Sequence, residues 1–300
     1  MTNNCYNHRM GSVRQKLVFT SLFIAATWCV STGCTEDLVI DDLGAQMDSE
    51  TSQNAQGDTS EASLCMPASS DDIAASPVVD VIIAVDNSAG MDDEVLMVQN
   101  ALADFYSRLA ASGVDGQITL ITAPSPSDDD KVKNGICVGT PLGSGECPDD
   151  SSLPAYFHVL QAIASKDALT LIHSTFEQWK SRIRENSQIH LMVISDDNAD
   201  VTADEFVALM NALTPPLENF FFHTVSASAD KTAACEADPP SPCCDYAAKA
   251  GVEYQNLAGR TGGVSADLCQ QDFSTAFNNI ADGVISLRCE SVMNVEIVPL

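Results

Sequence analysis

Oxygen-bearing side chains directly follow three stretches of the sequence that are predicted to be strands. Asp86 and Ser88 follow the first of these stretches, Ser165 follows the third predicted strand of the chain, and Asp196 follows the fourth. Carboxylates and hydroxyls are hard oxygen ligands, and with few charges and room for water they suit Mg²⁺ or Mn²⁺, and Ca²⁺ less tightly. These residue types predict a divalent-metal site, provided that the fold brings the ends of the three strands together.

The elements that must position these residues are strands and helices in alternation. Apolar, β-branched runs predict strands over residues 78–85, 118–123, 156–163, 189–195, 220–225 and 264–268. Apolar residues spaced three and four apart predict helices over 92–112 and 166–184, a third after the capping box at 202–205, a short one ending at 262–263 and a last one over 273–287. The alternation predicts an α/β fold with a doubly wound, mostly parallel sheet and helices on both faces.

The order of the strands decides whether the metal site can form. In an open parallel sheet, ligands bind outside the carboxyl ends of the strands, near the point where the strand order reverses. With a strand order such as 3-2-1-4-5, the first and fourth strands are neighbours. Asp86, Asp196 and the loop that holds Ser165 would then meet on one rim of the sheet.

Some of these residues also have a simpler structural interpretation. Asp and Asn after a strand often only stabilise a turn, and this is the preferred interpretation of Asp197. Ser165 suits the N-cap of the following helix equally well, and Thr170 is the second candidate for its role at the metal. The polar stretch 124–154 is expected to form a long surface loop.

The N-terminus has the features of an export signal. Residues 1–33 contain no Asp or Glu, and basic residues precede the apolar run 17–26. The segment VSTGC, which ends at Cys34, is similar to a bacterial lipobox, with Ser where Leu is usual. This similarity implies cleavage before Cys34 and lipidation of that cysteine. The alternative is a plain signal peptide that is cleaved near Gly33.

The composition excludes two classes of partner. The 300-residue chain carries 42 acidic and 14 basic side chains, which gives a formal net charge of −28. Binding to nucleic acid or to anionic lipid needs Lys and Arg, so the N-terminal lipid is the only membrane attachment we expect. Residues 34–75 hold no aromatic residue and are expected to form an acidic, disordered tether. Residues 76–290 are expected to form one domain, and 291–300 an extended segment.

The cysteines indicate an oxidising compartment. After cleavage before Cys34, eight further cysteines remain, and an even number in an exported chain suggests disulfides. The sequence alone does not decide how they pair. A zinc site is the weaker interpretation because no paired CxxC is present. The expected pairs are Cys137–Cys147 within one loop, Cys65–Cys289 across the ends of the domain, Cys235–Cys243 and Cys244–Cys269.

One segment makes a family resemblance specific. VDVIIAVDNSAGM resembles the opening of a von Willebrand factor type A domain, whose metal-ion-dependent adhesion site begins with Asp-x-Ser-x-Ser. Asp86 and Ser88 match the first two positions, whereas Gly90 stands in place of the second Ser. The later segment VISDD matches another strand of the family and places Asp196 at the metal. Ser165 is the best match for the loop Thr of the family.

The resemblance implies a binding protein and not an enzyme. In such domains the metal keeps one open coordination position, which an acidic residue of a partner protein completes. We therefore expect a lipid-anchored protein of the bacterial cell envelope with an adhesion or scaffolding role. The alternative is a structural interaction module with a degenerate metal site. A hydrolase on a similar sheet is the least favoured interpretation, because the Gly-Ser-Gly at 143–145 lacks the spacing of GxSxG.

Overall fold

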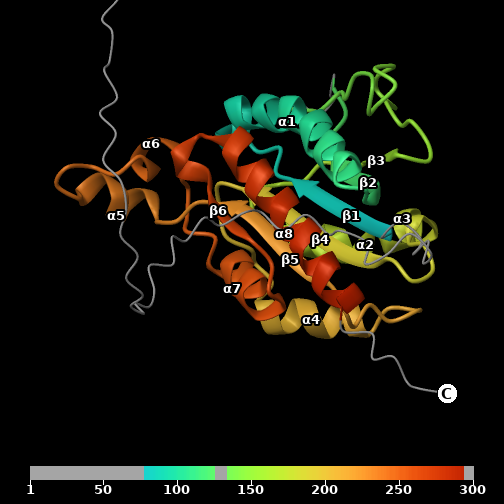
Figure 1. The fold of residues 1–300 in the computed structure, drawn as a ribbon. Coiled ribbons are helices and arrows are strands. Elements are labelled where there is room, and N and C mark those ends of the chain that lie inside the picture. The colour runs from blue at the N-terminus through green and yellow to red at the C-terminus, as the bar shows by residue number, and fades with distance from the viewer. Residues whose placement is uncertain (1–77, 126–133, 294–300) are drawn as a thin grey trace, which may run out of the picture. The chain divides into compact units, whose positions relative to one another are not determined.

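The computed structural model describes residues 78–125 and 134–293, with side chains described as far as residue 287. All described residues belong to one compact unit of the chain. They form a six-stranded, all-parallel sheet in the order β3-β2-β1-β4-β5-β6 (Figure 1). The strands are β1 (Val78–Val85), β2 (Asp115–Thr122), β3 (Tyr156–Leu160), β4 (Gln188–Ser195), β5 (Phe221–Ser226) and β6 (Ser265–Asp267).

Helices cover both faces of the sheet, which confirms the doubly wound α/β fold predicted from the sequence. One face packs against α1 (Asp92–Ala111) and α8 (Phe273–Met293). The other packs against α2 (Ala168–Ser174), α3 (Phe176–Trp179), α4 (Ala203–Asn211) and α7 (Val252–Thr261). Shorter helices lie in the loops: α5 (Lys231–Glu236), α6 (Cys243–Tyr246) and the 3-10 turns η1 (Ala89–Met91), η2 (Lys180–Arg182) and η3 (Leu268–Gln270).

The central strand β1 shows why the sequence adopts this fold. Val81 and Ile83 belong to the apolar cluster under α1 and α8, whereas Ile82 and Ala84 belong to the cluster on the opposite face. Because successive residues of a strand point to opposite faces, the apolar run 81–85 fits a strand that is covered on both sides. The strand order reverses between β1 and β4, so the carboxyl ends of these two strands lie side by side.

The helix predicted over 166–184 is interrupted. Thr175 separates α2 from α3, and its hydroxyl donates to the carbonyl of Leu171 at 2.7 Å. Such back-bonding by Thr competes with the helical ladder. The amide of Gln178 then reaches the carbonyl of Thr175 at 2.8 Å, which tightens the turn. The prediction of a single long helix is therefore wrong, although the apolar face of this segment, including Trp179, is buried as expected.

The described part of the loop between β2 and β3 is more deeply packed than a surface loop. Ile136, Val138 and Leu142 are buried and belong to the core cluster under α1. Cys137 forms a disulfide with Cys147, as predicted, and this bond closes the loop on itself. The expectation of a solvated loop over 124–154 is thus wrong for these apolar residues, because each is isolated in the sequence and shows no periodicity.

Two of the expected disulfides are exchanged. The structure joins Cys235 to Cys244 and Cys243 to Cys269, rather than Cys235 to Cys243 and Cys244 to Cys269. Cys243 and Cys244 are successive residues of α6, so their side chains point in directions that differ by roughly 100°. Cys243 is the buried one and faces Cys269, and Cys244 is half-buried. The expected Cys65–Cys289 pair lies outside the residues whose side chains are described.

The Cys243–Cys269 disulfide is expected to contribute strongly to stability. Changing both cysteines to Ser should lower the free energy of unfolding by about 3 kcal/mol, because the bond closes a long loop in the unfolded chain. Urea unfolding of the oxidised protein measures this loss. The matched control changes Cys137 and Cys147 to Ser, and should cost slightly less because that loop is shorter. A Cys243/Cys269 variant as stable as the wild type would contradict the prediction.

The last helix is longer than expected. α8 runs to Met293, so the first three residues of the segment 291–300, which was expected to be extended, are helical. Residues 294–300 lie outside the described residues, as do the signal segment, Cys34 and the tether. Among the described helices, none combines the length and the apolar character that crossing a membrane would require.

Candidate metal site

Asp86 lies where β1 ends, and its carboxylate is held from two sides. Its amide donates to the carbonyl of Ile194 at 3.0 Å, which continues the pairing with β4 for one more residue. Oδ1 accepts the amide hydrogen of Ser88 at 2.8 Å, and Oδ2 accepts the hydroxyl hydrogen of Ser195 at 2.9 Å. The side chain is fully buried, and this burial raises the pKa of Asp86 despite the two hydrogen bonds.

Ser88 and Ser165 lie in the two loops beside Asp86. Ser88 precedes η1, is half-buried and makes no side-chain capping bond to that turn, so its hydroxyl is not used as a helix cap. The carbonyl of Ser165 accepts from the hydroxyl of Ser195 at 3.4 Å. The same hydroxyl donates to Asp86, so Ser195 links the Ser165 loop to Asp86. The following helix starts with Asp167 in the N-cap position, so Ser165 does not cap it. Thr170, the second candidate, is exposed on α2.

Asp196 follows β4, and its carboxylate is buried without a complete set of partners. Asp196 is only 6% exposed, yet its Oδ1 makes no hydrogen bond. The backbone is fixed, because the carbonyl of Asp196 accepts the amides of Ala248 at 2.8 Å and Lys249 at 3.1 Å. Burial and then the charge of Asp86, with smaller contributions from Asp197 and Glu94, raise the pKa of Asp196 to about 7.

Asp86 and Asp196 are the two buried carboxylates of the candidate cation site. A buried carboxylate oxygen without a partner is costly, and the charge of Asp86 raises the pKa of Asp196, so the two carboxylates repel when both are ionised. A divalent cation between them would remove both costs, with Ser88 as a neutral ligand and Ser165 at the rim. Mg²⁺, Mn²⁺ and Ca²⁺ are the ions that prefer such oxygen donors.

The absence of a side chain at Gly90 leaves room for the carboxylate of Asp196. A Cβ atom added at residue 90 would overlap Oδ2 of Asp196, so the two side chains compete for one space. Gly90 is not among the glycines with positive φ, so its backbone can accept other residues. The glycine in place of a second Ser after Asp86 and Ser88 is therefore coupled to the position of Asp196, a relation that the sequence pattern does not reveal.

The structure adds Glu94 to the acidic residues near the site. Glu94 lies in the first turn of α1, is buried, and accepts a hydrogen bond from Nε2 of Gln271 at 2.8 Å. The sequence held a signal for it, since Glu94 lies one turn before Val98 on the apolar face of the helix. Asp197, in contrast, is a turn residue, as expected: its Oδ1 accepts the amide of Asn198, and its amide donates to Ser195.

Asn87, between the two motif residues, has a structural role. Its Nδ2 donates to Thr122 Oγ1 at 2.7 Å and to the carbonyl of Asn134 at 2.6 Å. Its Oδ1 accepts the amides of Ala123 at 2.8 Å and Ile163 at 3.2 Å. This fully buried amide therefore joins the carboxyl end of β1 to those of β2 and β3.

Removing the Asn87 amide is expected to destabilise the domain. Asn87→Ala should lower the free energy of unfolding by about 2–3 kcal/mol, because buried backbone groups of two neighbouring segments lose their partner. Urea unfolding gives the value. Asn100→Ala, which removes an exposed amide on α1, should change stability by less than about 0.5 kcal/mol. Equal effects of the two substitutions would contradict the role assigned to Asn87.

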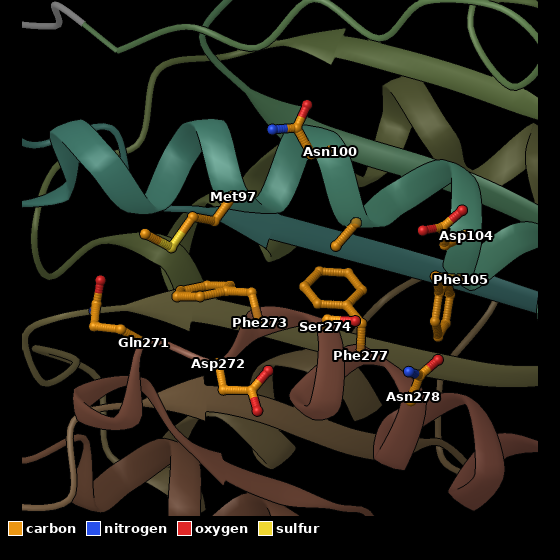
Figure 2. A pocket seen from close by; sticks show the side chains of 11 residues that line it. Met97, Asn100, Asp104, Phe105, Gln271, Asp272, Phe273, Ser274, Phe277 and Asn278 are labelled. Atoms are coloured by element: carbon orange, nitrogen blue, oxygen red, sulfur yellow. The ribbon is translucent and has the colours of Figure 1, made fainter. Parts of the chain in front are cut away.

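Other candidate groups do not form a second metal site. Cys137, Cys147 and Asp150 lie close together, as do Cys243, Asp267 and Cys269. Their cysteines are bonded to each other, however, and only a thiolate is a metal ligand. The pocket in Figure 2 lies between α1 and the start of α8; Met97, Phe273 and Phe277 line it, and it includes none of the predicted metal ligands.

The fold and the site define the class of this protein. It is a parallel α/β domain with a Rossmann-like topology and an acidic cluster at the carboxyl end of its two central strands. No protein-family model matches the chain, and no curated protein sequence matches it.

Proposed function

We propose that this chain is a von Willebrand factor type A-like binding module that holds a partner protein through a divalent cation. Asp86, Ser88 and Asp196 would bind Mg²⁺, Mn²⁺ or Ca²⁺, with Ser165 at the rim. One observation carries the proposal: Oδ1 of Asp196 is buried and unpartnered next to a second buried carboxylate, that of Asp86. The partner would supply an oxygen ligand to the cation, in an adhesion or scaffolding role.

Binding is favoured over catalysis by the burial of a His–Asp pair that resembles a catalytic dyad. His158 Nδ1 lies 2.5 Å from Oδ1 of Asp150, and both side chains are fully buried. A substrate cannot reach them, so this pair stabilises the fold. A hydrolase on this sheet remains the least favoured function.

The proposed location is the bacterial cell envelope. Three disulfides lie within the described residues, and disulfides persist in oxidising compartments outside the cytosol. Lipidation of Cys34 and the acidic tether 34–75 would hold the domain on the membrane, as the sequence predicts. The acidic composition favours neither nucleic acid nor an anionic lipid surface as a partner.

A second candidate function is a structural interaction module whose metal site has degenerated. Gly90 favours it, because the residue provides no hydroxyl ligand. The two functions are distinguished by using the full chain as bait on envelope extracts, with Mg²⁺ or with EDTA. The metal-dependent function requires that EDTA and Asp86→Ala both abolish capture of the same partner. Capture that neither treatment changes would instead support the structural module.

A further inference from the structure

We propose that His190 and His223 form an acid-sensitive latch, in which the uptake of a proton by the pair releases the start of β6 and the C-terminal half of α8 from the sheet. His190 lies on β4 and His223 on β5, and both side chains are fully buried. Met192 and Val225, two residues further along the same strands, belong to the apolar cluster under α1 and α8, so both rings point to that face. The latch is independent of the proposed cation site.

The hydrogen bonds of the pair determine where its two ring hydrogens lie. The amide of Val264 donates to Nδ1 of His223 at 3.0 Å, so this nitrogen carries no hydrogen, and the hydrogen of the neutral ring is on Nε2. Nε2 of His223 lies 2.9 Å from Nδ1 of His190 and donates to it, so the hydrogen of His190 is on its own Nε2. That nitrogen is buried and has no hydrogen-bond partner.

Neither ring can take a second proton without breaking a hydrogen bond. The added proton must go to Nδ1, because each Nε2 already carries one. On His223 it would face the amide hydrogen of Val264, and on His190 it would face the hydrogen on Nε2 of His223. The pKa of His223 is lowered to about 4 and that of His190 is lowered as well, in both rings chiefly because burial disfavours the charged form.

No charged group among the described side chains is placed to compensate a charge on the pair. β4 and β5 carry no Asp, Glu, Lys or Arg. On β1, Asp80 points to the opposite face of the sheet, because it alternates with Val81, a member of the cluster under α8. On α8, Asp282 is exposed and pairs with Arg108 of α1. On β6, Asp267 lies at the carboxyl end of the strand. A protonated ring would therefore remain an unpaired charge in the core, which is costly.

The helix α8 approaches the latch closely. A Cβ atom at Gly283 would lie 2.5 Å from Cγ2 of Val264 and 3.9 Å from Cε1 of His223, so the helix leaves no room between itself and these residues. A protonated His223 can reach water only if this contact opens. The same proton removes the bond from the amide of Val264, the residue that precedes β6. The charge thus loosens both contacts at one point.

The opening is limited to one end of each element. The N-terminal half of α8 is held by Phe277, whose ring packs edge-on against Phe105 with 5.7 Å between the centroids. Cys269, just beyond β6, is held by a disulfide. Residues 264–267 and 279–287 are therefore the segments that we expect to open, while the central strands stay paired.

The direction of the pH dependence follows from the two forms of the latch. In the open form both rings meet water and titrate near 6.5, the ordinary pKa of a histidine. In the closed form the pKa of His223 is about 4. Because the closed form has the lowered pKa, it is fully favoured above about pH 6.5 and loses its advantage as the pH falls. For each histidine, the equilibrium constant for opening rises by up to about tenfold per pH unit until about pH 4.

The test is hydrogen exchange of the full oxidised chain in EDTA at about pH 7.5 and about pH 5, read by mass spectrometry and corrected for the intrinsic pH dependence of exchange. Between the two conditions, the protection of residues 264–267 and 279–287 should fall by at least about tenfold. At about pH 5 their exchange should be nearly independent of low urea concentrations, because a local opening exposes little surface. The amides of β1 and β4 should stay better protected and should respond to urea.

A double variant removes the titrating groups of the latch. His190→Phe combined with His223→Asn leaves no ring that can take up a proton there, and the Asn oxygen can still accept the amide of Val264. The protection of residues 279–287 in this variant should change by less than about twofold between the two conditions. The matched control is His173→Asn, at a half-buried histidine on α2, which should keep the response of the wild type.

Three results would overturn the proposal. The double variant could respond to pH as the wild type does, the wild type could keep its protection over residues 279–287 at about pH 5, or these residues could open only together with β1 and β4. If circular dichroism shows that the double variant is unfolded, proton NMR of the wild-type histidines takes its place. Rings of the pair that titrate near 6.5 while residues 279–287 stay protected would then contradict the latch.

Discussion

Replacing His158 with alanine is expected to lower the free energy of unfolding by about 3–5 kcal/mol, because the core loses a large side chain and a buried acid loses a hydrogen-bond partner. His158 lies on β3 with Nδ1 2.5 Å from Asp150 and Nε2 3.3 Å from the carbonyl of Thr122. The imidazole therefore joins Asp150 of the loop to the end of β2 within the core. The variant would leave a cavity in the core and remove one hydrogen-bond partner of the buried Asp150.

The effect should extend to the loop that carries the disulfide. Asp150 also accepts the amide of Val138, and the hydroxyl of Tyr156 lies 3.4 Å from it. Urea unfolding of His158→Ala, Asp150→Ala and the double variant measures the coupling, and the double variant should lose less than the sum of the two single losses. His173→Ala, a half-buried histidine on α2, is the control. A His158 effect no larger than that of the control would show that the pair does not stabilise the loop.

Asp196→Asn is expected to make the cation-free protein more stable at pH 8, by up to about 4 kcal/mol, since each unit of pKa shift corresponds to about 1.4 kcal/mol. The pKa of Asp196 is raised from 3.8 to about 7. The folded state therefore binds a proton more tightly than the unfolded state does. The stability that the protonated Asp196 contributes to the fold is fully present below about pH 4, the ordinary pKa range of an Asp. This contribution is lost as the pH rises through 7. The neutral amide should not suffer this loss.

The measurement is urea unfolding of both proteins in EDTA between pH 4 and 8. The two should have equal stability at pH 4 and diverge as the pH rises. The buried pair His190 and His223 has lowered pKa values because burial disfavours its charged forms, so both proteins should also lose stability when the pH falls below about 6.5. That loss cancels in the difference between them. A difference that stays constant with pH would contradict the electrostatic origin of the effect.

Much of the fold could be predicted from the sequence because the strands are strongly patterned. The β-branched run 78–85 places apolar residues on both faces of the strand, so neither face suits contact with solvent. The capping box of Thr202 and Glu205 is present as predicted. Once strands and helices alternate, right-handed crossovers leave few strand orders, and the observed one places the ends of β1 and β4 together. Asp86, Ser88 and Asp196 could thus be placed on one rim.

Other features depend on tertiary packing and could not be predicted in this way. The disulfide exchange follows from the rotation of a short helix, α6, whose orientation no local pattern encodes. Ile136 and Leu142 are buried one by one in an irregular loop, without a period to reveal them. The contact between Gly90 and Asp196 joins residues more than a hundred positions apart, and only the sheet brings them together.

The cation site itself is tested most directly by titration calorimetry of Mg²⁺ and Mn²⁺ into the full oxidised chain, wild type and Asp86→Asn. The wild type should show one saturable site per chain above the weak binding that a net charge of −28 causes, and the variant should show only the weak binding. A cation at about 100 times its dissociation constant should then stabilise the wild type alone by about 2–3 kcal/mol. Identical titrations of the two proteins would contradict a metal site at Asp86.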